Sequence, residues 1–182
     1  MRSIKHAILK HVFPYFFGVW FRRTIFGSLA LFGIFGCSTD TVYEENVDVK
    51  NHVWMADSAM VFEFKIEQAT DKYDIFYNFR NTIAYPFYNL YVTYELKDRD
   101  EKVLLNDLYN MNLFDPKTGK PYGKGLGDIF SHQFKVIPQY EFPDTGTYTL
   151  HLKQYMRRDS LPEILSVGVS IKPGEAADRQ GD

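Results

Sequence analysis

Apolar side chains recur at every second position over much of the chain after residue 59. In the first such segment the apolar set is Met60, Phe62, Phe64 and Ile66, and the residues between them are mostly charged. Side chains on a strand point alternately to its two faces, whereas a helix repeats every 3.6 residues. A period of two therefore predicts a strand with one face buried and the other in water.

The same alternation recurs further along the chain, between short connections rich in turn residues. It covers segments 73–80, 88–96, 129–137, 147–155 and 165–171, the last with Val167, Val169 and Ile171 alternating against Ser166, Gly168 and Ser170. Segment 103–113 fits neither a strand period nor a helix period. Six or more strands without a convincing helix predict an all-β fold. A single β-sandwich, immunoglobulin-like or jelly-roll-like, is favoured over a barrel.

A short run before the segment 147–155 is typical of one class of sandwich. In Asp144-Thr145-Gly146-Thr147-Tyr148, a glycine that permits a sharp turn lies two residues before a tyrosine. The run resembles the corner of immunoglobulin-like domains in which a tyrosine hydroxyl bonds to the backbone a few residues upstream. A plain hairpin turn is the alternative interpretation.

The single cysteine, Cys37, follows a segment unlike the rest of the chain. Residues 1–36 hold five basic residues and no acidic residue, and an apolar run over 25–35 ends with Gly36 just before the cysteine. This order of positive, apolar and small residues is typical of a secretory signal. The apolar run is shorter than the roughly 18 residues that a membrane-spanning helix needs. We therefore expect an N-terminal export signal.

Ile34-Phe35-Gly36-Cys37 resembles the lipobox of bacterial lipoprotein signals. That resemblance implies a lipid on the Cys37 thiol and stable attachment to a membrane. A buried cysteine at the end of an ordinary signal or anchor helix is the alternative, and Arg22-Arg23 leaves a twin-arginine signal open. We expect a lipoprotein signal peptide over 1–36, a lipidated tether over 37–57, the β-sandwich over 58–172 and a disordered tail over 173–182.

Without the predicted signal the chain is acidic. Residues 37–182 carry 16 lysines and arginines against 23 aspartates and glutamates, a net charge of −7. Nucleic-acid binding depends on neutralisation of phosphates by basic side chains. The charge balance therefore excludes nucleic acid as the expected partner.

The glycine-rich segment Gly123, Lys124, Gly125, Leu126, Gly127 and Asp128 is the most conspicuous motif candidate. A dinucleotide-binding loop needs a strand before it and a helix after it, but a strand-like segment follows here and the Walker pattern is absent. We interpret the segment as a bent loop that enters a strand. Loops on a rigid sandwich often carry recognition, so it is a candidate interaction loop.

No catalytic, metal-binding or cofactor-binding pattern stands out. His52, His132 and His151 lie at spacings unsuited to shared ligation of a metal, and no Gly-x-Ser-x-Gly elbow is present. We therefore expect a protein that is not an enzyme, with no cofactor and no metal. A hydrolase whose site is assembled from distant residues stays as an alternative hypothesis, and a small-molecule ligand is left open.

Phe87 and Tyr91 share the face of their segment opposite Tyr88, Leu90, Val92 and Tyr94. Aromatic residues on both faces mean either a central strand buried on both sides or an exposed aromatic surface. Burial is the favoured interpretation. The exposed alternative would suit stacking on sugar rings, which makes a glycan-binding envelope lipoprotein the alternative function.

Two segments, 122–130 (Tyr-Gly-Lys-Gly-Leu-Gly-Asp-Ile-Phe) and 142–148 (Phe-Pro-Asp-Thr-Gly-Thr-Tyr), accompany the lipobox. Together they resemble the gliding-motility lipoprotein GldH family of Bacteroidota. The resemblance implies a lipid-anchored, non-catalytic assembly or scaffolding component of the gliding and secretion apparatus, with other envelope proteins as partners. Ser38, where an aspartate would favour retention at the inner membrane, favours the outer membrane. Cys37 is the one functional residue that the resemblance assigns.

Overall fold

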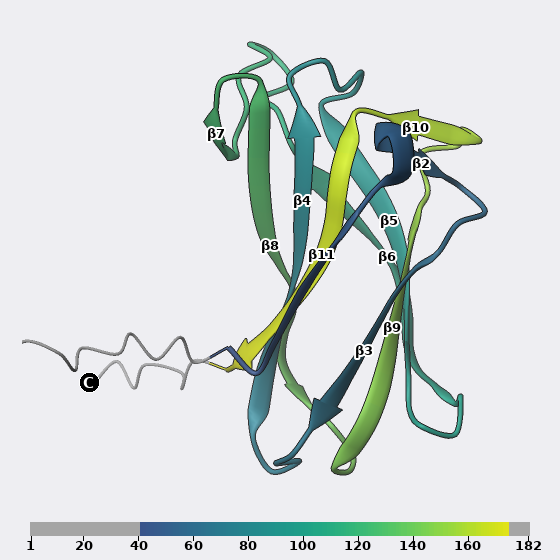
Figure 1. The fold of residues 1–182 in the computed structure, drawn as a ribbon. Helices are drawn as coiled ribbons and strands as arrows, with labels where there is room; N and C mark the ends of the chain where they lie inside the picture. The colour runs from purple at the N-terminus through teal and green to yellow at the C-terminus, as the bar shows by residue number, and fades with distance from the viewer. Residues whose placement is uncertain (1–40, 175–182) are drawn as a thin grey trace, which may run out of the picture. The chain divides into compact units, whose positions relative to one another are not determined.

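The computed structural model describes residues 41–174, and strands account for nearly all the elements of this part of the chain (Figure 1). The elements are β1 (Tyr43–Asp48), η1 (Lys50–His52), β2 (Val53–Met55), β3 (Met60–Ile66), β4 (Lys72–Thr82), β5 (Asn89–Lys97), β6 (Val103–Asn112), β7 (Lys124–Leu126), β8 (Ile129–Glu141), β9 (Gly146–Gln154), β10 (Ser160–Pro162) and β11 (Ile164–Pro173). η1 is a single 3-10 turn.

The strands form two antiparallel sheets that face each other. The five-stranded sheet has the order β1-β11-β4-β8-β7 and the four-stranded sheet the order β3-β9-β5-β6, while β2 and β10 pair separately. Tyr77 of β4 and Tyr94 of β5 meet across the interior with ring centroids 5.9 Å apart, edge to face. An all-β sandwich is therefore confirmed.

The alternating segments supply the core. On β3 the side chains of Phe62, Phe64 and Ile66 are buried, and those of Glu63 and Lys65 between them are exposed. Burying one side chain of this size contributes about 1.5–3 kcal/mol relative to leaving it in water. β4, β5, β8, β9 and β11 likewise occupy the segments in which a period of two predicts a strand.

β6 occupies the segment whose sequence pattern is ambiguous. It pairs only with β5 and forms the edge of the four-stranded sheet. Met111 is its one fully buried side chain, and Val103 and Leu108 remain exposed. An edge strand is only partly covered, so its apolar residues need not keep to one face.

The folded domain begins earlier than we expect from the sequence, and the predicted tether over 37–57 is wrong for its described part. β1 pairs with β11 from Tyr43↔Ile171 to Asp48↔Ser166. Trp54 of β2 is completely buried, and its Nε1 donates to the backbone oxygen of Ser58 at 3.0 Å. The core therefore includes residues from the predicted tether.

The other predicted boundaries fall at the edges of the described chain. β11 extends to Pro173, and the backbone N–H of Gly174 donates to the oxygen of Lys72 at 2.6 Å. Residues 173 and 174 thus belong to the folded part rather than to the predicted tail. The predicted signal peptide over 1–36 and the rest of the tail lie outside the described residues.

The predicted tyrosine corner is present between β8 and β9. The Tyr148 hydroxyl donates to the backbone oxygen of Asp144 at 2.6 Å. Gly146, where β9 begins, has φ of +150°, which residues with side chains rarely adopt. The upstream hydrogen bond inferred from the sequence is confirmed.

Candidate interaction site

The glycine-rich segment forms most of a hairpin between β7 and β8. Lys124 pairs with Ser131, and Leu126 pairs with Ile129, which leaves Gly127 and Asp128 as a two-residue turn. Gly127 has φ of +64°. Two-residue hairpins favour glycine at such a position because only glycine adopts a positive φ without strain. The sequence predicts a bent loop that enters a strand, whereas in the structure Lys124–Leu126 itself forms the paired strand β7.

The hairpin is held against the sandwich by its backbone. A Cβ added to Gly125 would come within 2.3 Å of the Phe130 ring, so the glycine lets the β7 backbone lie directly on that ring. The backbone N–H of Ile83, in the β4–β5 loop, donates to the oxygen of Asp128 at 2.8 Å. These contacts fix the position of the hairpin tip.

The turn before β7 is organised by Asp115. Its Oδ1 accepts hydrogen bonds from the backbone N–H groups of Lys117 (2.9 Å) and Thr118 (2.8 Å). Its Oδ2 accepts a hydrogen bond from the Tyr122 hydroxyl at 3.0 Å. Donation from the Thr118 and Lys117 backbone lowers the pKa of Asp115, so the carboxylate stays ionised and keeps its partners. Tyr122 thereby has a fixed orientation beside the hairpin.

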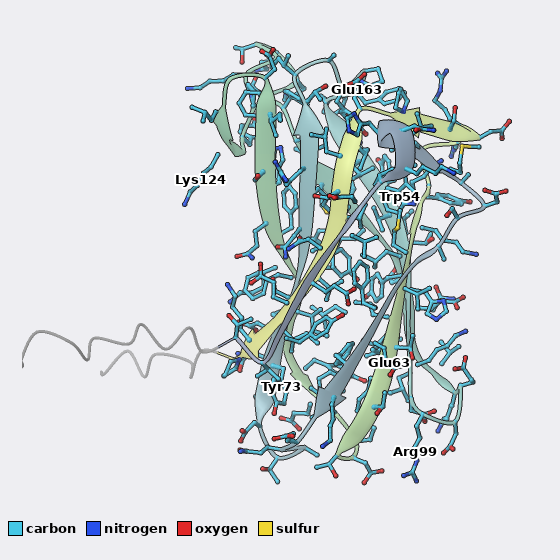
Figure 2. The ribbon with its side chains drawn as sticks, viewed as in Figure 1. Trp54, Glu63, Tyr73, Arg99, Lys124 and Glu163 are labelled. Carbon is cyan, nitrogen blue, oxygen red and sulfur yellow. The ribbon has the colours of Figure 1, made fainter. Side chains whose placement is uncertain are left out.

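Three aliphatic side chains remain in water around the hairpin tip. The exposed fraction is 92% for Leu126, 46% for Ile83 and 36% for Ile129. We call these three residues the hairpin patch. A hollow of about 450 Å³ beside it is lined by Leu126, Ile129, Arg80 and Lys124 among others. In Figure 2 the Lys124 side chain extends outward from the β7 side of the domain. Clustered apolar side chains with a polar rim suit the burial of a partner's apolar side chain.

The other predicted site residues are not part of this patch. Cys37 lies outside the described residues. Tyr91 is 36% exposed on the outer face of β5, so that face is not buried as we favoured from the sequence. Phe87 is partly buried, with its ring 5.8 Å from that of Tyr85 and with Arg158 over its face. Phe87 therefore presents little free ring surface for a sugar.

Tyr88 also departs from its expected place. It precedes the first residue of β5, Asn89, and is half exposed instead of facing inward with Leu90. The strand begins one residue later than the pattern predicts. The alternation of β5 holds only inside the paired region.

Residues 41–174 contain no cluster of three or more histidine, cysteine or acidic side chains that could hold a metal ion. The same part of the chain has no helix long and apolar enough to cross a membrane.

Nothing in the sequence pattern marks Ile83 as a member of the site. Ile83 belongs to no alternating run, and only the pairing of Thr82 with Ile129 brings it beside the hairpin. Ile129 lies in a predicted strand, but its exposure depends on the position of β7 at the edge of the sheet. Ile83 and Ile129 could be identified as members of the patch only once the pairing of the strands was known.

Comparison with known proteins gives a consistent result. The family model described as "GldH lipoprotein" matches residues 41–171. "Gliding motility lipoprotein GldH homolog" from Christiangramia forsetii is 30% identical over 146 residues, covering 76% of this chain and 88% of the relative. "Gliding motility lipoprotein GldH" from Flavobacterium johnsoniae is 29% identical over 153 residues, covering 79% of this chain and 92% of the relative.

Proposed function

This chain belongs to the GldH lipoprotein family, and from that premise we propose that it is a lipid-anchored, non-catalytic assembly component of the gliding and secretion apparatus. The lipid is carried by Cys37, and the membrane is the outer membrane. The lipobox-like Ile34-Phe35-Gly36-Cys37 supports the anchor. The relatives' names, which are those of motility lipoproteins, support the role in gliding.

The hairpin patch is the single observation that carries the assembly role. Leu126 is almost completely exposed although the backbone of its strand is paired with β8 and lies on the Phe130 ring. A rigid exposed aliphatic residue loses little conformational entropy when a partner covers it. With its cross-strand partner Ile129 on the same face, Leu126 can act as the central anchor of an interface.

The test is capture of the full-length lipoprotein from chemically cross-linked envelopes. The wild-type protein should recover other envelope proteins, and Leu126→Asp should lower their recovery at least tenfold. Loss of a central anchor costs roughly 2 kcal/mol or more, and each 1.4 kcal/mol is a factor of ten. The variant must first show the thermal unfolding of the wild type.

Val61→Asp is the matched control, because Val61 is also an exposed aliphatic residue on a strand but belongs to β3 in the other sheet. It should recover the same proteins as the wild type. Equal recovery with Leu126→Asp, or repeated recovery of no envelope protein by the wild type, would contradict the assembly role.

A further inference from the structure

The outer face of the five-stranded sheet carries a row of polar side chains, one from each strand. Asp48, Ser166, Arg80, Ser131 and Lys124 are successive cross-strand partners on β1, β11, β4, β8 and β7. Directly opposed residues share a face, so these five side chains lie side by side about 5 Å apart from strand to strand.

A second polar row runs parallel to the first, two residues along each strand. Asn46, Gly168, Asn78 and Gln133 are partners on β1, β11, β4 and β8. Gln133 Nε2 donates to Asn78 Oδ1 at 2.9 Å, which holds these two amides in place. A Cβ on Gly168 would collide with the Asn46 amide, so the glycine lets that amide lie across the sheet.

These rows line a cleft of about 710 Å³. Small residues on β11 form its floor, since Ser166 and Gly168 lie between the longer side chains of β1 and β4. Tyr122, held by Asp115 and more than half exposed, lines the same cleft. An exposed ring fixed in this way offers a flat surface beside an array of amides and hydroxyls.

One side chain of the first polar row is buried without a partner for its polar atom. Ser166 is 2% exposed and its Oγ makes no hydrogen bond. Buried polar groups are nearly always paired in native proteins, and an exception calls for a ligand or a water.

The cleft lining holds two acidic and two basic side chains, at opposite sides. Glu44 and Asp48 lie on β1 at one side, and Arg80 and Lys124 lie on β4 and β7 at the other. Within residues 41–174, neither Arg80 nor Lys124 has an ion-pair or hydrogen-bond partner for its side chain. Two unpaired cations with Ser131 between them suit a ligand carboxylate.

We propose that this cleft binds an acidic saccharide. A sugar carboxylate is placed between Arg80 and Lys124, and the sugar hydroxyls pair with the amides of the second row and with Asp48. An apolar ligand does not fit, because amides, hydroxyls and charges line the floor and would be left unpaired. The proposal does not depend on the assembly role.

The experiment is calorimetric titration of the full lipidated chain, in detergent, with a hexamer of galacturonate. Maltohexaose is the neutral saccharide control, and a short polyglutamate peptide is the control for charge alone. We expect the uronate to bind and the other two to bind at least tenfold more weakly. Loss of a charge-assisted hydrogen bond commonly changes affinity by this factor.

Two variants locate the site. Arg80→Gln should weaken uronate binding at least tenfold, whereas Arg99→Gln, which removes the same charge at the remote β5–β6 tip (Figure 2), should not. Ser166→Ala should weaken binding while the urea midpoint of unfolding stays unchanged, because its hydroxyl has no protein partner to lose.

No binding of uronate at millimolar concentration would overturn the proposal. Equal binding of polyglutamate would also overturn it, since the cleft would then recognise charge and not sugar. Equal binding of maltohexaose would overturn the role assigned to the carboxylate. Wild-type affinity in both Arg80→Gln and Ser166→Ala would place the bound saccharide elsewhere and refute this site.

Discussion

His132 combines deep burial with an ionisable ring. It lies opposite Phe79 on β4 and stacks against Phe134 with ring centroids 5.9 Å apart. Burial lowers its pKa from 6.5 to about 4, because the apolar surroundings disfavour the imidazolium. The ring is therefore neutral in the folded protein near pH 7. Acidification must either charge it inside the domain or unfold the domain.

The sign of the pH dependence follows from the two pKa values. Between pH 6.5 and 4 the unfolded chain binds a proton that the folded chain does not, so acid favours unfolding. The contribution of the neutral His132 ring to stability is fully present well above pH 6.5. The free energy of unfolding should fall by about 1–2 kcal/mol between pH 7.5 and 5. Urea unfolding at both pH values should show this loss in the wild type and not in His132→Phe.

His151→Gln is the control for this comparison, because it removes a histidine of β9 that is only partly buried. It should keep the wild-type pH dependence. A His132→Phe variant that loses as much stability as the wild type between pH 7.5 and 5 would show that His132 does not cause it.

At the scale of elements, β1 and β2 decide where the domain begins. β1 supplies a neighbour for β11 along six residues, and its Tyr43 ring lies 5.5 Å from that of Phe64 on β3. Trp54 on β2 packs 6.3 Å from the Phe79 ring. Removal of a buried tryptophan alone costs about 3–5 kcal/mol, a large part of the roughly 5–15 kcal/mol by which domains are stable.

A chain that starts at Ser58 should therefore fail to fold, whereas one that starts at Thr41 should fold. Circular dichroism, gel filtration and urea unfolding distinguish the two. We expect a cooperative transition for residues 41–182 and aggregation or no transition for residues 58–182. Equal urea midpoints for the two chains would mean that β1 and β2 contribute nothing to the fold.

β3 and β1 also show which strands could be predicted from the sequence pattern and which could not. β3 was predictable because Phe62, Phe64 and Ile66 all point to the core. β1 was not, because only Tyr43 and Val47 of its six residues pack against the core, too few to show a period. A period of two is visible only where one face of a strand is consistently buried.

The candidate sites follow the same rule. The sharp turn before β8 was predictable from Gly123, Gly125 and Gly127, because glycines mark close backbone approach and turns, but the pairing of β7 with β8 was not. The hairpin patch and the polar rows were not predictable either, since they depend on which strands are neighbours. Ser166 and Asp48 are 118 residues apart in the chain and become partners only through the antiparallel pairing of β1 with β11. Single-sequence patterns carry no information on such a register.

At the scale of the whole molecule, the first residue of β1 and the hairpin patch lie at opposite ends of one sheet. Only five residues separate Cys37 from the start of β1 at Tyr43, a reach of at most about 21 Å. The Tyr43 row continues through Ile171 and Ile75 to Ile137. Ile129 is eight residues before Ile137 on β8, about 26 Å away. The proposed lipid on Cys37 would thus be joined to the folded domain by a short segment.

This attachment depends on lipidation at Cys37. Metabolic labelling with an alkyne palmitate should label the wild-type protein in the outer-membrane fraction. Cys37→Ala should lose both the label and the membrane association, because the lipid chains supply the attachment, at about 0.8 kcal/mol per buried methylene. Leu126→Asp is the control and should keep both.

Label that persists in Cys37→Ala would place the lipid on another residue, and label absent from the wild type would mean that residues 1–36 end in an ordinary signal or anchor. Either result would contradict attachment of this domain through a lipid on Cys37.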